Sequence, residues 1–377
     1  MSERALLQIP DSIDTPSLVV DIDILQQNID AMAADISALG VSLAPHAKTH
    51  RTPQIAKMQM AAGAEALCIA KLGEAEVLSE SGLDSFVMAY PIVGETKLDR
   101  ARRLMASASI LLSVDSADAG KALAANMSRA GVEADVLVIV DTGYHRCGVS
   151  PTDAPGLASY LAGLDGIRLR GFITHEGHAY AAPEADGLRD ESVAAGRALV
   201  AAAEAARALG LDIDVVSVGS SATARHSASA EGVTQARPGI YAFNDYGQVL
   251  RGVVGMDRCA ARVAATVVSH VAPGQAILDA GSKALSQDRL GIHVPGAPGV
   301  FGLVVDLPGW ELFQLSEEHG WIRWIGDGAP GPLDIGQRVQ ILPNHICSIF
   351  HMLGQSEIVR SGEHIDTWVA TARGASR

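Results

Sequence analysis

The segment SLAPHAKTHR, residues 42–51, begins as an apolar run and ends in a cluster of basic side chains. His46, Lys48, His50 and Arg51 fall within six positions of a chain whose formal net charge is −14. A turn after a buried strand is usually served by Ser, Asn or Asp. The segment therefore indicates a strand whose carboxyl end carries chemistry.

Similar strand-like runs recur along the chain, and Ala-rich segments with helical spacing, such as residues 191–210, separate most of them. The eight runs are residues 41–46, 66–71, 86–91, 110–115, 134–141, 167–175, 213–221 and 232–243. Continuous apolar strands that alternate with helices are typical of a parallel sheet. Eight such units predict an α/β fold, a (β/α)8 TIM-type barrel.

Beyond about residue 255 the pattern changes to strand-like runs joined by Gly and Pro turns, as in 260–285 and 336–350. This change predicts a second, mostly β domain. We expect the barrel to span residues 13–255. The β domain would then take residues 256–377 together with residues 1–12. The first apolar run, TPSLVVDIDIL (15–25), precedes the eight barrel strands and is expected to pair with the β domain.

Composition limits the class of protein. The apolar runs are at most about eight residues long, far short of the roughly 20 that cross a bilayer. The N-terminus shows no secretory pattern, so we expect a cytoplasmic protein. The net charge of −14 argues against nucleic acid and membrane partners. The four cysteines, at positions 68, 147, 259 and 347, are too widely spaced to suggest a disulfide framework.

Titratable side chains gather at the predicted carboxyl ends of the strands, where (β/α)8 barrels carry their active sites. His46 and Lys48 follow the first strand, Arg146 follows the fifth, and His175 and Tyr180 follow the sixth. For any one of these residues, the alternative interpretation is that strand ends meet water and therefore carry polar side chains. The set indicates catalysis, with His46, Lys48, Arg146 and His175 as the candidates.

The loops after the seventh and eighth strands read VGSSATA (218–224) and RPGIY (237–241). Phosphate sites of such barrels commonly use these two loops, whose N–H groups and hydroxyls hold the anion. A lysine on the same rim predicts that Lys48 binds pyridoxal 5'-phosphate as a Schiff base, with His46 and Arg51 helping to keep the amine partly neutral. The alternative for Lys48 is a solvated surface lysine.

Near the C-terminus, the motif PNHICS contains His345 and Cys347. We expect a strand there, which would place both side chains on one face. Imidazole and thiolate are ligands that zinc and neighbouring metals accept. A buried cysteine beside a capping histidine is the alternative.

Six motifs together resemble the fold-type III pyridoxal phosphate enzymes, in the branch of the D-threonine aldolase / D-serine dehydratase family. They are PHAKTHR (45–51), DTGYHRCGV (141–149), GFITHEGHAY (171–180), VSVGSSATA (216–224), RPGIYAFND (237–245) and LDAGSKALS (278–286). The resemblance covers about residues 13–375. It implies an alanine racemase-like barrel followed by a β domain, a homodimer, and the cofactor on Lys48.

The resemblance also implies roles for single residues. Arg146 would lie beside the cofactor ring, with Tyr180 and His175 lining the site. The residues implied to hold the phosphate are Gly219, Ser220, Ser221, Gly239 and Tyr241. His345 and Cys347 match the His-x-Cys pair that holds a divalent metal in the D-serine dehydratases, where characterised aldolases have His-x-Asp. The thiolate favours zinc over manganese or magnesium.

The activity implied is that of a lyase acting on small D-β-hydroxy-α-amino acids. Removal of the α-proton by Lys48 would lead to dehydration, giving a keto acid and ammonia. Removal of the β-hydroxyl proton would instead give glycine and an aldehyde. His-x-Cys favours the dehydratase, with the aldolase as the alternative. A racemase would leave the metal idle, and non-catalytic pyridoxal phosphate carriers resemble the barrel alone.

Overall fold

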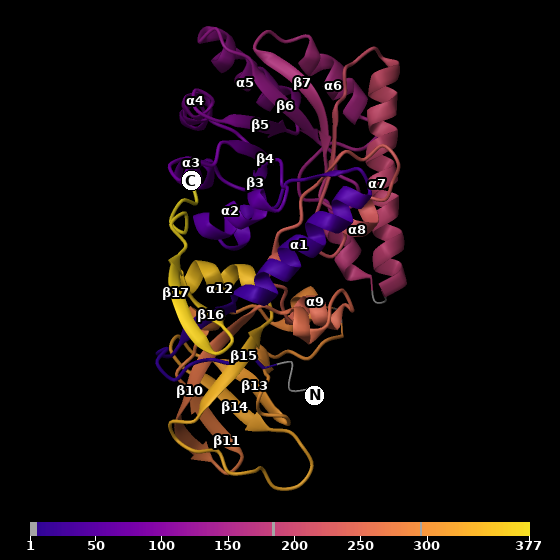
Figure 1. Cartoon of the computed structure of the whole chain (residues 1–377). Coiled ribbons are helices and arrows are strands. Elements are labelled where there is room, and N and C mark those ends of the chain that lie inside the picture. The colour runs from indigo at the N-terminus through magenta and orange to yellow at the C-terminus, as the bar shows by residue number, and fades with distance from the viewer. Residues whose placement is uncertain (1–5, 183–184, 295) are drawn as a thin grey trace. The chain divides into compact units, whose positions relative to one another are not determined.

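The computed structural model describes residues 6–182, 185–294 and 296–377 (Figure 1). They fall into two compact units. One runs from Asp30 to Gly239 and includes Gly374–Arg377; the other contains the described residues up to Ile29 and Ile240–Arg373. These limits differ from the expected 13–255 and 256–377, because residues 13–29 and 240–255 group with the β unit.

The first unit is built on an eight-stranded sheet in which all neighbouring strands are parallel. Its strands are β2 (Ser42–Leu43), β3 (Leu67–Ile69), β4 (Ser85–Pro91), β5 (Ser109–Val114), β6 (Ala134–Ile139), β7 (Ile167–Ile173), β8 (Val215–Val218) and β9 (Gln235–Ala236). The order is β2-β9-β8-β7-β6-β5-β4-β3. A parallel bridge between His46 and Cys68 joins the two ends of this order. The predicted (β/α)8 barrel is confirmed, and each expected run overlaps one strand.

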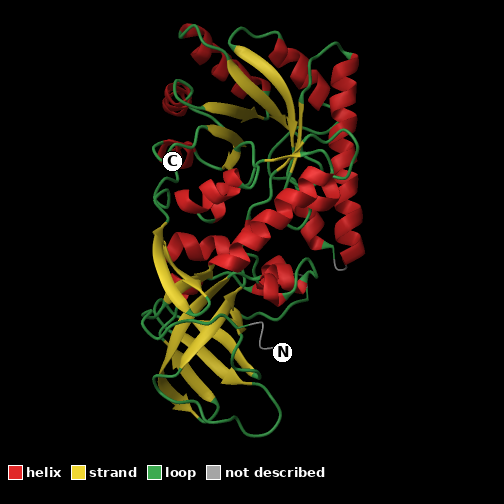
Figure 2. Ribbon diagram, in the orientation of Figure 1, coloured by secondary structure: helices red, strands yellow, loops and turns green. Residues whose placement is uncertain are grey.

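Helices alternate with these strands, and Figure 2 shows them outside the strands of this unit. They are α2 (Pro53–Ala61), α3 (Leu72–Ser79), α4 (Glu95–Leu104), α5 (Ala117–Arg129), α6 (Ala154–Ala162), α7 (Ala185–Ala208) and α8 (Ala224–Ser227). In α5 the buried Leu123 and Ala124 lie three and four positions after the buried Gly120, and four and three before the buried Met127, as expected for a helix with one covered face. No helix in the described ranges is both long and apolar enough to span a membrane.

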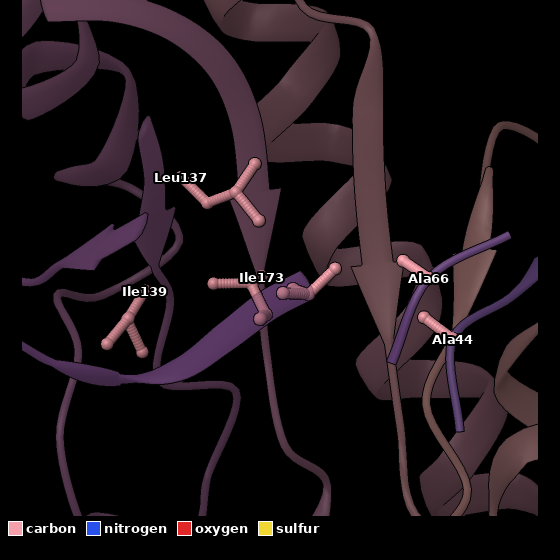
Figure 3. Close-up of a cluster of buried hydrophobic side chains, with 6 residues drawn as sticks. Ala44, Ala66, Leu137, Ile139 and Ile173 are labelled. Atoms are coloured by element: carbon pink, nitrogen blue, oxygen red, sulfur yellow. The ribbon is translucent and has the colours of Figure 1, made fainter. Parts of the chain in front are cut away.

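The barrel interior is filled by side chains from several strands and from residues directly beside them (Figure 3). They are Ala44, Ala66, Val87, Leu137, Ile139 and Ile173. Since side chains alternate along a strand, the residue two positions beyond Ala44 continues the inner face, and so does the residue two beyond Ile173. Those residues are His46 and His175, which therefore continue this face toward the carboxyl end of the barrel.

The second unit is a nine-stranded sheet in the order β11-β14-β13-β12-β15-β10-β1-β16-β17. Its strands are β1 (Ser17–Asp21), β10 (Ala261–Ala272), β11 (Gln275–Leu278), β12 (Gly302–Val304), β13 (Trp310–Leu315), β14 (Gly320–Trp324), β15 (Arg338–Pro343), β16 (Gln355–Arg360) and β17 (Glu363–Val369). A second pairing, β11 with β10, closes six of them into an antiparallel barrel.

The remaining strands of this unit extend the sheet from β10. β1 pairs antiparallel with β10 and parallel with β16, so the expected pairing of the first apolar run is confirmed. Helix α1 (Ile22–Ala38) follows β1 directly, and only its residues up to Ile29 group with this unit. The shorter helices α9 (Tyr246–Leu250), α10 (Ser282–Leu285), α11 (Leu290–His293) and α12 (Ile346–Leu353) complete the unit.

Candidate active site

Lys48 lies on a short 3₁₀ helix, η2 (Ala47–Thr49), directly after the first barrel strand. Its neighbours Ala47 and Thr49 are buried, whereas Lys48 itself is exposed. The Lys48 N–H donates to Nδ1 of His46 at 3.4 Å. The buried flanks hold the backbone of this turn, and the amine remains open to a ligand.

Two histidines close to Lys48 are neutral at pH 7. Burial lowers the pKa of His46 well below its usual value, and the charges of Lys48 and Arg237 lower it further. Burial, with the charges of Lys48 and Arg146, lowers the pKa of His175 to about 3. His175 Nδ1 lies 3.0 Å from the Gly219 carbonyl oxygen. Because a carbonyl only accepts, Nδ1 carries the proton and Nε2 keeps a lone pair.

Arg146 lies on the loop after β6, and Asp141 stabilises this loop by accepting hydrogen bonds from other residues of the loop. Asp141 Oδ1 accepts the N–H groups of Gly143 and His145 at 2.9 and 3.0 Å. Its Oδ2 lies 2.9 Å from Nδ1 of His145. Burial raises the pKa of Asp141, but these hydrogen bonds outweigh it and leave the pKa below its usual value. The loop leaves Arg146 exposed beside Tyr144.

Four of the residues expected to hold a phosphate lie in the buried loops after β8 and β9. A Cβ at Gly219 would come within 2.9 Å of the Arg237 Cβ, and one at Gly239 within 3.0 Å of Oγ1 of Thr49. The Gly239 N–H donates to Oγ of Ser221 at 3.0 Å. These glycines let the backbone come close to its neighbours, as an anion cradle needs.

Hydrogen bonds already present refine the expected roles in this cradle. The Gly219 N–H donates to Oε2 of buried Glu176 at 3.0 Å. Gly219 therefore leaves space for a phosphate but does not offer its N–H to it. Ser220 Oγ shares a hydrogen bond with Oγ1 of Thr223 at 2.7 Å. Tyr241 is buried in η4 (Ile240–Ala242) of the β unit, and its role on the phosphate stays a prediction.

Sequence reasoning missed the buried Arg237. Its Nε donates to Oγ of Ser217 at 3.1 Å, and its Nη2 donates to the carbonyl oxygen of Thr174. Ser217 Oγ in turn donates to Oε1 of Gln235 at 2.7 Å. Burial lowers the pKa of Arg237. The sequence signal that could have revealed it is an arginine placed one residue beyond a buried strand. An arginine there is buried, and a buried guanidinium requires hydrogen-bonding partners.

The metal-ligand pair lies on a helix start and not on a strand, so that expectation was wrong. β15 ends at Pro343, His345 is the N-cap residue of α12, and Cys347 falls in its first turn. Buried Ile346, Ile349 and Phe350 lie three and four positions apart, which is the period of a helix. Gly354, at φ 74°, ends it in the left-handed conformation.

A buried carboxylate that the sequence reasoning did not select holds His345. Asp245 Oδ2 lies 3.3 Å from Nδ1 of His345 and accepts the Ile346 N–H at 3.2 Å. Its Oδ1 accepts the Gln248 N–H at 3.0 Å and so caps α9. Burial lowers the pKa of His345, but the charges of Cys347 and Asp245 and their hydrogen bonds outweigh it and raise the pKa well above its usual value.

A histidine whose second nitrogen meets a carboxylate is the usual arrangement of a protein metal ligand. With Nδ1 directed at Asp245, His345 would bind a metal through Nε2, and Cys347 supplies a sulfur on the same turn. The donor set therefore fits a divalent ion. Among residues 6–182, 185–294 and 296–377, no group of three or more His, Cys, Asp and Glu side chains is arranged to hold one.

A parallel (β/α)8 barrel with a lysine after its first strand, followed by an antiparallel β-barrel, defines the alanine racemase-like class of pyridoxal phosphate enzymes. Residues 20–247 match the family model of the alanine racemase N-terminal domain, and residues 260–359 match a putative serine dehydratase domain. The chain belongs to the D-threonine aldolase / D-serine dehydratase family of fold-type III enzymes.

Several curated relatives match nearly the whole chain. It is 35% identical to the D-threo-3-hydroxyaspartate dehydratase of Delftia sp. (strain HT23), over 95% of this chain and 97% of the relative. It is 32% identical to the D-threonine aldolase of Arthrobacter sp, over 97% and 94%. The D-threonine aldolase of Filomicrobium marinum superimposes with a TM-score of 0.88 at 31% identity, covering 99% of both chains.

The solved Delftia dehydratase superimposes with a TM-score of 0.89 at 34% identity, covering 95% of this chain and 98% of the other. Two solved variants of a D-threo-3-hydroxyaspartate dehydratase replace a histidine and a cysteine two positions apart by alanine. The cysteine variant is described as the metal-free form. His345 and Cys347 have the same spacing.

Proposed function

We propose that this protein is a pyridoxal phosphate- and divalent-metal-dependent lyase that acts on small D-β-hydroxy-α-amino acids. The observation that carries the proposal is the contact between His345 and Asp245, with Cys347 in the same helical turn. A histidine with a carboxylate on its second ring nitrogen, beside a thiol, is the usual arrangement of metal ligands. The exposed amine of Lys48, close to two neutral histidines, supplies the second requirement. The relatives are named as dehydratases and aldolases of such amino acids.

The barrel residues fit the cofactor. Lys48 Nζ would carry it, Arg146 would lie beside its ring, and the cradle at Gly219 and Gly239 would take the phosphate. When bound, pyridoxal phosphate withdraws electrons from the bonds at the amino acid's α-carbon. Lys48 would then take the α-proton on its amine, since burial and neighbouring charges lower the pKa of His175 to about 3 and so make that imidazole a weak competing base.

The β unit supplies the second group. His345 and Cys347 would hold a divalent ion, whose chemistry is to polarise the substrate β-oxygen. Asp245 keeps the imidazole in the tautomer that leaves Nε2 for the ion. The thiolate favours zinc over manganese or magnesium. The solved cysteine-to-alanine variant of a D-threo-3-hydroxyaspartate dehydratase, which is in the metal-free form, supports the assignment.

We favour dehydration to a keto acid and ammonia, because Cys347 gives the His-x-Cys pattern and Lys48 offers the amine for the α-proton. The alternative is retro-aldol cleavage to glycine and an aldehyde. Relatives named D-threonine aldolase, 32% and 31% identical to this chain, support it. A homodimer is part of the same proposal and is tested by sedimentation of the purified protein.

Product analysis tests the function. The protein, loaded with pyridoxal phosphate and zinc, is incubated separately with D-serine, D-threonine and D-threo-3-hydroxyaspartate. A keto acid with equimolar ammonia supports dehydration; glycine with an aldehyde establishes the aldolase and refutes our preference. Chelation should abolish either activity. Conversion of the D-amino acid to its L-enantiomer that survives chelation would instead indicate a racemase, and the absence of any turnover a carrier or a bulkier substrate.

Cys347→Asp and Cys347→Ala give a matched pair for the metal. Cys347→Asp creates the His-x-Asp pattern and should retain metal binding with a preference shifted from zinc toward manganese. Cys347→Ala should lose most of the bound metal. Equal metal content in the wild type and Cys347→Ala would contradict the site.

A further inference from the structure

Two loops at the carboxyl end of the barrel interlock through two aromatic rings and two glycines. The loop after β6 carries Gly143, Tyr144 and Arg146, and the segment after β7 carries His175, Gly177 and His178. Each loop places a ring against a glycine of the other. Neither Tyr144 nor His178 belongs to the site residues described so far.

The first contact is between Tyr144 and Gly177. A Cβ on Gly177 would lie 2.7, 2.8 and 2.9 Å from Cε2, Cζ and Cδ2 of the tyrosine ring. A real Cβ does not approach carbon so closely, so the ring occupies its present place only because residue 177 is glycine. Any larger residue at position 177 has to displace the ring.

The second contact is the reciprocal one, between His178 and Gly143. A Cβ on Gly143 would lie 3.2–3.3 Å from Cδ2, Cε1 and Cγ of the imidazole. Three nearly equal distances mean that the ring presents its face to this glycine. Gly143 also has φ 134°, which disfavours other residues. On its other side, His178 Nε2 lies 3.9 Å from Oε2 of Glu191 on α7.

Tyr144 contacts both residues that the proposed function uses on these loops. Its ring meets His175 edge-on, with centroids 5.3 Å apart and an interplanar angle of 77°. The Arg146 guanidinium carbon lies 5.0 Å from the same ring centroid. These distances are those of a favourable aromatic pair and of a cation–π contact. The ring therefore spans the space from the guanidinium to the imidazole.

We propose that Tyr144 is a positioning residue, seated on Gly177, that sets Arg146 and His175 relative to one another for catalysis. The catalytic part of this inference rests on the proposed function, whereas the seating of the ring does not. The aromatic ring carries the effect, since its contacts are made by the ring face and edge and not by the hydroxyl.

A double-mutant cycle tests the proposal on the cofactor-loaded protein. Gly177→Ala and Tyr144→Ala should each lower kcat about 10- to 100-fold, because a displacement near 1 Å has effects of that size. The double variant should match the single ones, since a ring that is absent cannot be displaced. Tyr144→Phe should restore kcat to within about threefold of the wild type, because it keeps the ring.

The control is Gly156→Ala on α6, where a Cβ would meet nothing within 4 Å. Each variant is also followed by the visible circular dichroism of the bound cofactor, which reports its asymmetric surroundings without turnover. Gly177→Ala and Tyr144→Ala should reduce that band equally, and the double variant no further. This arm decides the seating of the ring even if no lyase activity is found.

Two results would overturn the inference. Multiplicative losses in the double variant would mean that the two residues act independently. A Tyr144→Ala protein with wild-type kcat and an unchanged cofactor dichroism would mean that the ring positions nothing.

Discussion

Replacing Asp245 by Asn tests the metal centre without removing a ligand. The carboxylate now accepts from three donors: the Gln248 N–H, the Ile346 N–H and His345 Nδ1–H. An Asn keeps one acceptor oxygen, which still caps α9, because Asn and Asp are equally good N-caps. Its amide NH₂ then faces the two remaining donors.

The size of the effect follows from those contacts. Asp245 is 1% exposed, so no water replaces the lost acceptor. Leaving a buried donor unsatisfied costs about 1–3 kcal/mol, which should appear in the unfolding free energy of the metal-free protein. Loss of the carboxylate behind a ligating histidine typically weakens metal binding about 10- to 100-fold. Asp245→Asn should therefore show both losses.

Zinc affinity is measured by competition with a chromophoric chelator, and stability by urea unfolding of the metal-free protein. Ser116→Ala is the matched control. Ser116 Oγ accepts the Ala119 N–H at 3.3 Å as the N-cap of α5, so its loss costs about 1 kcal/mol and leaves zinc affinity unchanged. If Asp245→Asn bound zinc as tightly as the wild type, Asp245 would not orient a metal ligand.

Further predictions concern the barrel. Lys48→Ala should abolish the visible absorption band of the cofactor-loaded protein, and a band that survives would place the cofactor elsewhere. Gly219→Ala should destabilise the fold by about 1–3 kcal/mol and weaken cofactor binding, because its Cβ would press on the Arg237 backbone oxygen at 3.1 Å; unchanged urea unfolding would contradict this. Burial lowers the pKa of His50 to about 4, so its unfolded form binds the proton first as pH falls below about 6.5. Stability should fall by about 2 kcal/mol at pH 5 relative to neutral pH, and His50→Gln should flatten that dependence in urea unfolding at both pH values. An equal drop in wild type and variant would assign the acid sensitivity to other groups.

Most of the fold was readable from the sequence because its signals are local. Alternation of apolar strands with helical segments needs only neighbouring residues, and all eight barrel strands overlap the expected runs. The eighth run, residues 232–243, shortens to Gln235–Ala236. Pro238 has no N–H to donate to a neighbouring strand, and such limits shorten strands. The change to β structure near residue 255 was equally local.

The candidate residues of the barrel were readable for a topological reason. In a (β/α)8 fold the carboxyl ends of all strands meet on one rim, so positions distant in sequence converge without any knowledge of packing. Lys48, His175 and the glycines after β8 and β9 follow from this rule. The same rule does not predict how deeply each side chain is buried. It therefore did not reveal that Arg237 is buried and donates a hydrogen bond to Ser217.

The sequence by itself determined which residue types lie at strand ends and that His345 and Cys347 are two positions apart. Tertiary structure alone decided how they are held. Asp245 meets the His345–Ile346 turn across about 100 positions of chain, and Tyr144 rests on Gly177 across two separate loops. The periodicity of a segment shows which of its faces is buried, but not which residues cover that face. The contacts of Asp245 and Tyr144 depend on which segments the packed core brings together.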